Sequence, residues 1–376
     1  MAPRTVDIVA AGPPSPDLYD PAAPAWALAA ALAGRGHSVQ VVFPGPAETP
    51  PPTAGVAVAP FPPVTAHVGT ALGDAELTRA AAHHLRPDSQ VIVRDPSGLG
   101  QIGLRRGRRP VVSFVRSLAA DLAAVAAPSG GLRSRLASWG DRHGVHRLEK
   151  EALEEASAIC CASTAQRDRL RADYGIAPER LRVEPPAFAH GPEPPTRAAA
   201  RRQLTVPDDI VLGVLLPPVD PATKEEATAA LEAFARTRPI FPGARLAAVG
   251  FPEATGPGVV PLAGRDAGTV AAAVAAADVA VSFSTGSVLD PGLVAALRAG
   301  VATIVPPSAD LGDGAEAAVR RAPLTDAGEL ASVVAELFAD PEARLALGES
   351  GRQFARRFEP ERLVQELETV GALGLA

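Results

Sequence analysis

The chain of 376 residues contains only 2 cysteines, and these are adjacent, at Cys160 and Cys161. They lie in the short apolar segment SAICCAS, which predicts a buried strand. Because neighbouring strand residues point to opposite faces, the pair makes a poor metal site, and two small core residues are the better interpretation. A disulfide framework is excluded, which favours a reducing compartment.

Long hydrophobic runs are also absent. The N-terminal sequence MAPRTVDIVAAGPP lacks the apolar core of a signal peptide. No segment reaches the roughly 18 uninterrupted apolar residues of a membrane span. We therefore expect a cytoplasmic protein without a transmembrane segment.

Positive charge is in short supply, with 36 Lys and Arg against 42 Asp and Glu and a net charge of -6. The chain therefore has no electrostatic footprint for nucleic acid. His83 and His84 are adjacent on a predicted helix, where they diverge by about 100° and cannot chelate one metal ion together. The sequence predicts no metal site, and it contains no nucleophile elbow, Walker motif or complete dinucleotide fingerprint.

What the sequence does contain is a regular alternation of strand and helix patterns. Residues 5–11 predict a strand, AWALAAALAGRGH a helix that stops at Gly36, and residues 38–45 the next strand. A strand–helix–strand unit of this kind implies a parallel sheet. The strands are apolar throughout, which suits sheets that helices cover on both faces.

A proline-dense segment, residues 184–197, interrupts this alternation and is the best candidate for an interdomain linker. We therefore expect an α/β fold with two Rossmann-like doubly wound domains, residues 1–190 and residues 198–358. In open parallel sheets ligands bind at the carboxyl ends of the strands, so the expected site is a cleft between the domains.

Five segments follow one another in order along nearly the whole chain. They are LAGRGHSVQVVFP, ALEEASAICCASTAQRDRLRADYGIAPERLRVEPP, ALEAFARTRPIFPGARLAAVG, AAADVAVSFSTGSVLDPGLVAALRAGVATIV and LGESGRQFARRFEPERLVQELETV. Together they resemble family-four retaining glycosyltransferases of the GT-B fold. The resemblance implies a hexosyltransferase-type enzyme that moves a sugar from a nucleotide-diphosphate sugar to an acceptor without a metal or other cofactor. It also implies that a C-terminal helix, residues 359–376, packs back on the first domain.

The residues that family members use to hold the sugar donor are replaced in this chain. An Arg that clamps the donor diphosphate corresponds to Pro218, and two Glu correspond to Ser287 and Ala295. Asp290 and Pro291 predict the N-cap and first position of a helix whose start faces the diphosphate in the family. A carboxylate there would occupy the free N–H groups and repel a phosphate.

The remaining donor-side candidates are two cations and one loop. By resemblance, Lys224 corresponds to a diphosphate-binding Lys, with an exposed Lys on the first turn of a helix as the alternative. Arg265 lies in a loop that in the family runs near the donor base. Backbone N–H groups of the loop after a predicted strand complete the expected site. These loop residues are Thr285, Gly286, Ser287, Val288 and Leu289.

On the acceptor side, the loop AAGPPSPDLYDP replaces a glycine-rich loop of the family and keeps a single glycine. Its side chains Asp17, Tyr19 and Asp20 either face the cleft or are solvated. Asp95 and Arg116 end predicted strands of the first sheet. By resemblance, Arg116 stands where the family has His, and it either meets an anion or forms a surface salt bridge. The acceptor-side candidates are Gly12, Asp17, Asp95 and Arg116.

Three hypotheses remain open at this point. The protein is an active glycosyltransferase, whose partners are a nucleotide sugar and a small-molecule or glycan acceptor. Alternatively, because the Arg and both Glu are lost, it is an inactive GT-B protein, such as an accessory subunit of a partner transferase. The third hypothesis is a GT-B enzyme whose site is rebuilt for another donor or reaction. The abundance of Ala, Pro and Arg fits a GC-rich bacterial genome.

Overall fold

The protein is described here by a computed structural model. The described residues are 3–15, 18–20, 22–46, 54–63, 71–95, 111–115, 146–147, 149–189, 193–217, 224–284 and 289–369.

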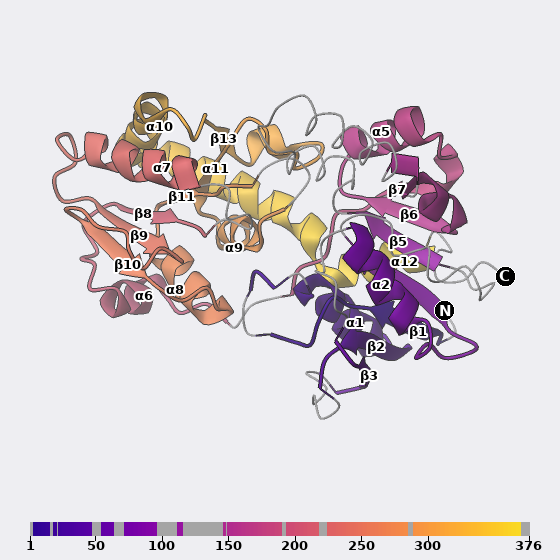
Figure 1. Ribbon diagram of the computed structural model, residues 1–376. Coiled ribbons are helices and arrows are strands. Elements are labelled where there is room, and N and C mark those ends of the chain that lie inside the picture. The colour runs from indigo at the N-terminus through magenta and orange to yellow at the C-terminus, as the bar shows by residue number, and fades with distance from the viewer. Residues whose placement is uncertain are drawn as a thin grey trace, which may run out of the picture. The chain divides into compact units, whose positions relative to one another are not determined.

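The chain divides into two compact units, each built on one parallel sheet (Figure 1). The first comprises Met1–Pro14, Pro21–Ala189 and Pro360–Ala376, and the second comprises Ser15–Asp20 and His190–Glu359. The predicted fold class, α/β with two Rossmann-like domains, is confirmed. The short segment Ser15–Asp20 groups with the second unit, which the sequence did not predict.

The sheet of the first unit has seven parallel strands in the order β3-β2-β1-β4-β5-β6-β7. The strands are β1 (Thr5–Val9), β2 (Ser38–Pro44), β3 (Val56–Phe61), β4 (Gln90–Asp95), β5 (Val111–Val115), β6 (Ala158–Cys161) and β7 (Leu181–Val183). The described helices of this unit are α1 (Ala23–Gly34), α2 (Ala71–Ala81), α5 (Thr164–Tyr174), the single 3-10 turn η2 (Pro178–Arg180) and α12 (Pro360–Thr369). Both cysteines are buried in β6, as predicted.

Local signals explain where these helices begin and end. Ser163 caps α5 by accepting a hydrogen bond from the Gln166 N–H, and Gly175 ends it in the left-handed conformation at φ +67°. The C-terminal helix α12 packs on α1 and contributes Leu363 to the core of this unit. At its end, Glu368 accepts hydrogen bonds from the side chains of Arg35 and His37.

The sheet of the second unit has six parallel strands in the order β10-β9-β8-β11-β12-β13. The strands are β8 (Leu212–Leu215), β9 (Arg245–Val249), β10 (Val259–Leu262), β11 (Val279–Val281), β12 (Ala302–Val305) and β13 (Arg320–Arg321). The helices are α6 (Arg197–Gln203), α7 (Lys224–Thr237), α8 (Ala267–Ala276), α9 (Pro291–Ala299), α10 (Ala327–Ala339) and α11 (Pro341–Ala355), with 3-10 turns η4 (Ala315–Ala317) and η5 (Arg356–Phe358).

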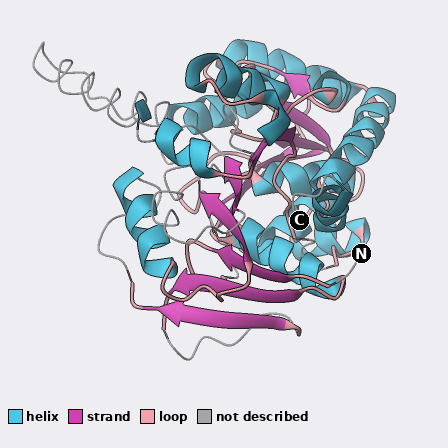
Figure 2. Ribbon diagram, turned by 90° about the vertical axis from the view of Figure 1, so that its right-hand side faces the viewer, coloured by secondary structure: helices cyan, strands magenta, loops and turns pink. Residues whose placement is uncertain are grey.

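Helices cover both faces of this second sheet. Side chains of α7 and α10 form one hydrophobic cluster against it, and side chains of α6 and α8 form another on the opposite face. Figure 2 shows the strands as layers flanked by helices. Burial on both faces explains why strands such as LGVL carry no charged residue.

The strand order places a topological switch point between β8 and β11, from which the chain continues to opposite sides of the sheet. The loops after these two strands therefore diverge at the carboxyl edge, where open parallel sheets bind ligands. This edge is where the candidate site is built. None of the helices among the described residues has the length and hydrophobicity of a membrane span.

A buried arginine joins the first helix of the second unit to the rest of that unit. Arg201 of α6 has no exposed surface, and its Nη2 forms an ion pair with Asp278 Oδ2 at 2.7 Å. Its other N–H groups donate to backbone carbonyl groups, including Ala276 at 3.0 Å and Pro207 at 2.8 Å. One guanidinium thus joins α6 to the end of α8 and to the loop before β8.

Replacing Arg201 by Met is expected to lower the free energy of unfolding by about 3 kcal/mol or more, because it leaves several buried acceptors unpaired. Urea unfolding measures this loss. The matched control is Arg202→Met, since Arg202 is the exposed neighbour on the same helix. Equal unfolding midpoints for the two variants would contradict this structural role of Arg201.

Candidate functional site

The carboxyl edge of the second sheet gathers polar groups at its switch point. Strand β8 continues into Leu216 and Pro217, and β11 continues into Ser282 and Ser284. Both serine side chains are buried, at 0% and 3% exposure. Buried hydroxyl groups need hydrogen-bond partners, and here these partners come from the start of α9.

Asp290 forms the centre of this arrangement as the N-cap of α9, which confirms the predicted cap. Its Oδ1 accepts a hydrogen bond from the Gly292 N–H at 2.7 Å, and its Oδ2 accepts one from Ser282 Oγ at 2.9 Å. Its own N–H donates to Ser284 Oγ at 3.1 Å. The two serine oxygens lie 3.2 Å apart, so Ser282, Ser284 and Asp290 form one closed network.

Burial of this carboxyl group raises the pKa of Asp290 to about 6. Hydrogen bonds from Ser282 and from the backbone N–H groups of Gly292 and Leu293 favour the ionised form and limit the rise. The side chain of Tyr19 acts in the same direction. Near pH 7 the carboxylate is thus mostly ionised, and it occupies N–H groups with which a helix start can bind an external anion.

Tyr19 comes from the segment Ser15–Asp20 and is only 7% exposed. Its ring belongs to a hydrophobic cluster with Leu216 and Val249, which follow or end strands β8 and β9. Its hydroxyl group lies against Gly292, where any Cβ atom would collide with it. On the other side, the guanidinium carbon of Arg265 lies 4.7 Å from the centre of the ring, which is a cation–π distance.

The backbone beside Arg265 is shaped by a glycine. Gly250 follows β9 with φ +76°, a conformation that side-chain-bearing residues rarely adopt. A Cβ atom at this position would approach Pro217 Cβ to 2.7 Å and Arg265 Cγ to 3.2 Å. The turn after β9 therefore passes close beneath both residues, and it holds the arginine at the carboxyl edge.

The polar contacts of Arg265 differ from those of Asp290, whose carboxylate is hydrogen-bonded. Within the described part of the chain, no Asp or Glu forms an ion pair with Arg265, and its buried Nε has no hydrogen-bond partner. A guanidinium group without a carboxylate partner is able to bind an anion. Tyr19 thus has the positive group of Arg265 over its ring and the buried, hydrogen-bonded carboxylate of Asp290 near its hydroxyl group.

The structure brings together some of the predicted donor-side residues. Arg265 and the buried Leu289 lie at this edge, and Ala295 lies in α9. Lys224 begins α7, but its side chain lies outside the described residues. Pro218 and the loop residues Thr285, Gly286, Ser287 and Val288 also lie outside them.

Of the acceptor-side candidates, three fall in the first unit, and Asp17 falls in the segment Ser15–Asp20, which groups with the second unit. Gly12 follows β1, and its carbonyl oxygen accepts a hydrogen bond from Trp26 Nε1 at 3.2 Å. Asp95 ends β4, the neighbour of β1 in the sheet, and its side chain is not among those described. Asp17 and Arg116 lie outside the described residues. Their roles stay predictions.

The sequence did not single out Ser282, Ser284 or Gly250 as parts of this edge. The spacing of Ser282 and Ser284 before an N-cap Asp is a local signal that could have indicated the network. The sequence places Tyr19 in a loop of the predicted first domain, whereas the structure groups it with the second unit. In the part of the chain that the structure describes, no cluster of His, Cys, Asp and Glu could hold a metal ion.

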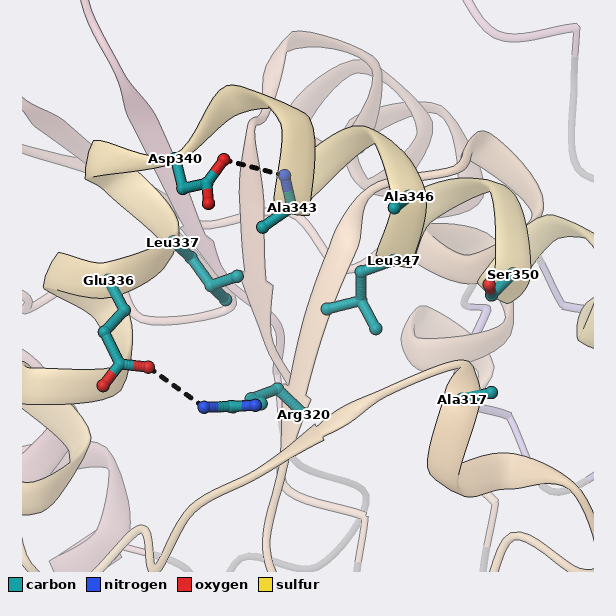
Figure 3. A pocket seen from close by; sticks show the side chains of 9 residues that line it. All are labelled: Ala317, Arg320, Glu336, Leu337, Asp340, Ala343, Ala346, Leu347 and Ser350. Atoms are coloured by element: carbon teal, nitrogen blue, oxygen red, sulfur yellow. Dashed lines mark hydrogen bonds and ion pairs between the residues drawn. The ribbon is translucent and has the colours of Figure 1, made fainter.

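A hollow of about 500 Å³ lies elsewhere on the second unit, between α10, α11 and β13 (Figure 3). Leu337 and Leu347 line it, and an ion pair joins Arg320 to Glu336 at 3.0 Å. The end of α10 lies by the strand starts, because Phe338 packs beside Gly213 at the beginning of β8. The hollow is thus remote from the carboxyl edge, and none of the predicted site residues lines it.

Comparison with known proteins agrees with this architecture. Residues 25–189 match the family described as Glycosyltransferase Family 4. Sucrose-phosphate synthase from Thermosynechococcus elongatus is similar over 98% of both chains, with 17% identity and a TM-score of 0.72. Residues 25–189 are thus family-four-like in sequence, and the chain as a whole has the GT-B fold. The family match and the shared fold support a glycosyltransferase.

Two further GT-B structures are similar over the full length. WaaG, a glycosyltransferase involved in lipopolysaccharide biosynthesis, has 17% identity and a TM-score of 0.68, covering 98% of this chain and 99% of its own. HepE from Anabaena, in complex with UDP-glucose, has 14% identity and a TM-score of 0.65, with 98% and 100% covered. No curated protein matches the chain in sequence. The family-four match ends before the second unit, so the edge around Asp290 is similar to these proteins in fold alone.

The raised pKa of Asp290 makes a prediction for stability. A folded-state pKa above the unfolded value means that the folded protein binds the proton more tightly, so this group's contribution to stability is lost as pH rises from about 4 to about 6. Asn caps helices equally well and does not titrate. Between pH 4.5 and pH 7.5, Asp290→Asn should gain about 2 kcal/mol of unfolding free energy relative to the wild type.

The control for this measurement is Asp326→Asn. Asp326 is an exposed N-cap of α10, and hydrogen bonds from the Glu329 and Gly328 N–H groups lower its pKa. Because it is ionised in both states above pH 4.5, its substitution should change stability by the same amount at both pH values. A flat pH profile for Asp290→Asn would show that the carboxyl group does not titrate as proposed.

Proposed function

We propose that the protein transfers a sugar from a nucleotide-diphosphate sugar to an acceptor with retention of anomeric configuration. The observation that carries this proposal is the guanidinium group of Arg265 at the carboxyl edge of the second sheet, where no described carboxylate neutralises it. The solved structures of HepE with UDP and with UDP-glucose support the class of donor. Arg265 would meet the negative charge that such a donor carries.

A retaining reaction of this kind asks little of protein side chains, since the leaving diphosphate can assist the attack on the same face of the sugar. The protein's main task is then to stabilise the charge that develops on the diphosphate. Lys224 would supply a point charge, and the backbone N–H groups of residues 285–289 would supply hydrogen bonds. We propose that no metal or other cofactor takes part.

The second candidate function is an inactive GT-B protein that serves as an accessory subunit of a partner transferase. One observation favours it: the carboxylate of Asp290 already occupies the N–H groups at the start of α9. In addition, Ala295 offers no side-chain acceptor for the donor ribose. The acceptor, a cytoplasmic location and a bacterial source stay predictions from the sequence.

Thermal unfolding with UDP, GDP, ADP and TDP at millimolar concentration tests the proposed function. A nucleotide present at 100 times its Kd stabilises the folded protein by about 2.7 kcal/mol, which raises the Tm by about 2–4 °C for each kcal/mol. Lys224→Ala should reduce this shift. Arg245→Ala is the control, because Arg245 is exposed at the start of β9, on the opposite edge of the same sheet.

The absence of a shift with every nucleotide would rule out the active-enzyme proposal. Co-purification of the protein with an active transferase would then favour the accessory subunit. A shift that Lys224→Ala leaves unchanged would remove Lys224 from the donor site while the proposed function stands.

A further inference from the structure

Arg265 lies over the aromatic ring of Tyr19, and this contact determines which of its N–H groups stay available as hydrogen-bond donors. A guanidinium group that stacks on a ring uses its flat face, so the N–H groups around its rim stay available for hydrogen bonds. A carboxylate partner would consume those same N–H groups. The Arg265 Cζ atom lies 4.7 Å from the centre of the Tyr19 ring, a cation–π contact that orients the side chain and does not require its terminal Nη donors, while its Nε is buried.

Two other arginines of the second unit show what a structural role looks like in this fold. Arg201 donates to the carbonyl groups of Ala276 and Pro207 and pairs with Asp278. Arg321 also donates to backbone carbonyl groups, including that of Ala309 at 2.9 Å. Within the described residues, Arg265 has no such acceptor. Its position therefore is not explained by a need to satisfy the backbone.

The ring beneath Arg265 is itself fixed in place. Tyr19 is almost fully buried in the cluster with Leu216 and Val249, and its hydroxyl group lies against Gly292. A ring locked at both ends is a rigid platform, so the cation on it is preorganised. Preorganisation lowers the entropy that a ligand must remove on binding.

We infer that Arg265 binds a phosphate group of the ligand at this edge and that Tyr19 is the positioning residue that orients it. The ligand's identity as a nucleotide sugar rests on the proposed function, whereas the phosphate contact does not. A guanidinium fork matches two phosphate oxygens at once. Arg265 would thus replace, from the loop after β10, the charge that is missing at Pro218 after β8.

Isothermal titration of the full chain tests this with two probes, inorganic pyrophosphate and the nucleoside diphosphate that shifts the Tm. Each is compared with the corresponding nucleoside, which carries no phosphate. Arg265→Ala should weaken both phosphate probes by about tenfold or more, because a charged hydrogen-bonded pair is lost. Affinity for the nucleoside should not change. Arg265→Lys should lie in between, and Arg245→Ala should match the wild type.

Two substitutions of Tyr19 test the roles of its ring and of its hydroxyl group separately. Tyr19→Phe keeps the ring and should bind the phosphate probes as the wild type does. Tyr19→Leu should weaken them about threefold, the size of a partly exposed cation–π contact. In the Arg265→Ala background, Tyr19→Leu should have no further effect. The Tm of every variant is measured, and Arg265→Lys serves if Arg265→Ala does not fold.

Three outcomes would overturn the inference: unchanged phosphate affinity in both Arg265 variants, equal losses for the nucleoside and its diphosphate, or an effect of Tyr19→Leu that persists without Arg265. If pyrophosphate binding depends on Arg265 but no nucleotide binds, the proposed function fails and the inference stands. If a nucleotide binds independently of Arg265, the inference fails and the proposed function stands. If neither probe binds the wild type, both fail.

Discussion

Asp290 places a fully buried carboxylate at the start of α9, and the arrangement of the surrounding groups follows from the need to satisfy that charge. Ser282 and Ser284 leave the end of β11 with their hydroxyl groups turned into the network, and Gly292 presents its N–H group to the carboxylate. Gly292 must also lack a side chain, because the Tyr19 hydroxyl group lies against it. One buried charge thereby ties the switch-point loop, the helix and the segment Ser15–Asp20 to one another.

This constraint explains how a site at this edge differs from one that relies on a free helix start. The positive end of a helix attracts anions only while its N–H groups are open. In this chain Asp290 closes the first turn of α9, and an incoming phosphate would meet a like charge there. The attraction must come from a side chain with open donors, and Arg265 is placed to supply it. The ring of Tyr19 holds Arg265 at this edge, and among the described residues no carboxylate forms an ion pair that would neutralise it.

The fold could be predicted largely from the sequence because its signals are local. The segment 38–45 predicted β2 to within one residue, Gly175 ends α5, and Asp290 caps α9. Each depends on neighbours a few positions away, which a single sequence displays. The pairing of Tyr19 with Arg265 joins residues far apart in the chain. No periodicity or cap indicates such a contact, and so the sequence predicts this loop as part of the first domain only.

The replaced family residues and the contact of Arg265 with Tyr19 together bear on whether the donor site is lost or rebuilt. By the resemblance in sequence, Pro218 and Ala295 stand where family members have a cation and an acceptor, and loss of function is the simplest interpretation of those changes taken alone. A protein that had only lost its donor site would have no reason to keep a rigid aromatic platform under an arginine that lacks a described partner. The buried Nε of Arg265 has no acceptor among the described residues, and such an unsatisfied donor is costly to stability unless a ligand supplies an acceptor. The Tyr19–Arg265 pair therefore favours a rebuilt anion site over a vestigial one.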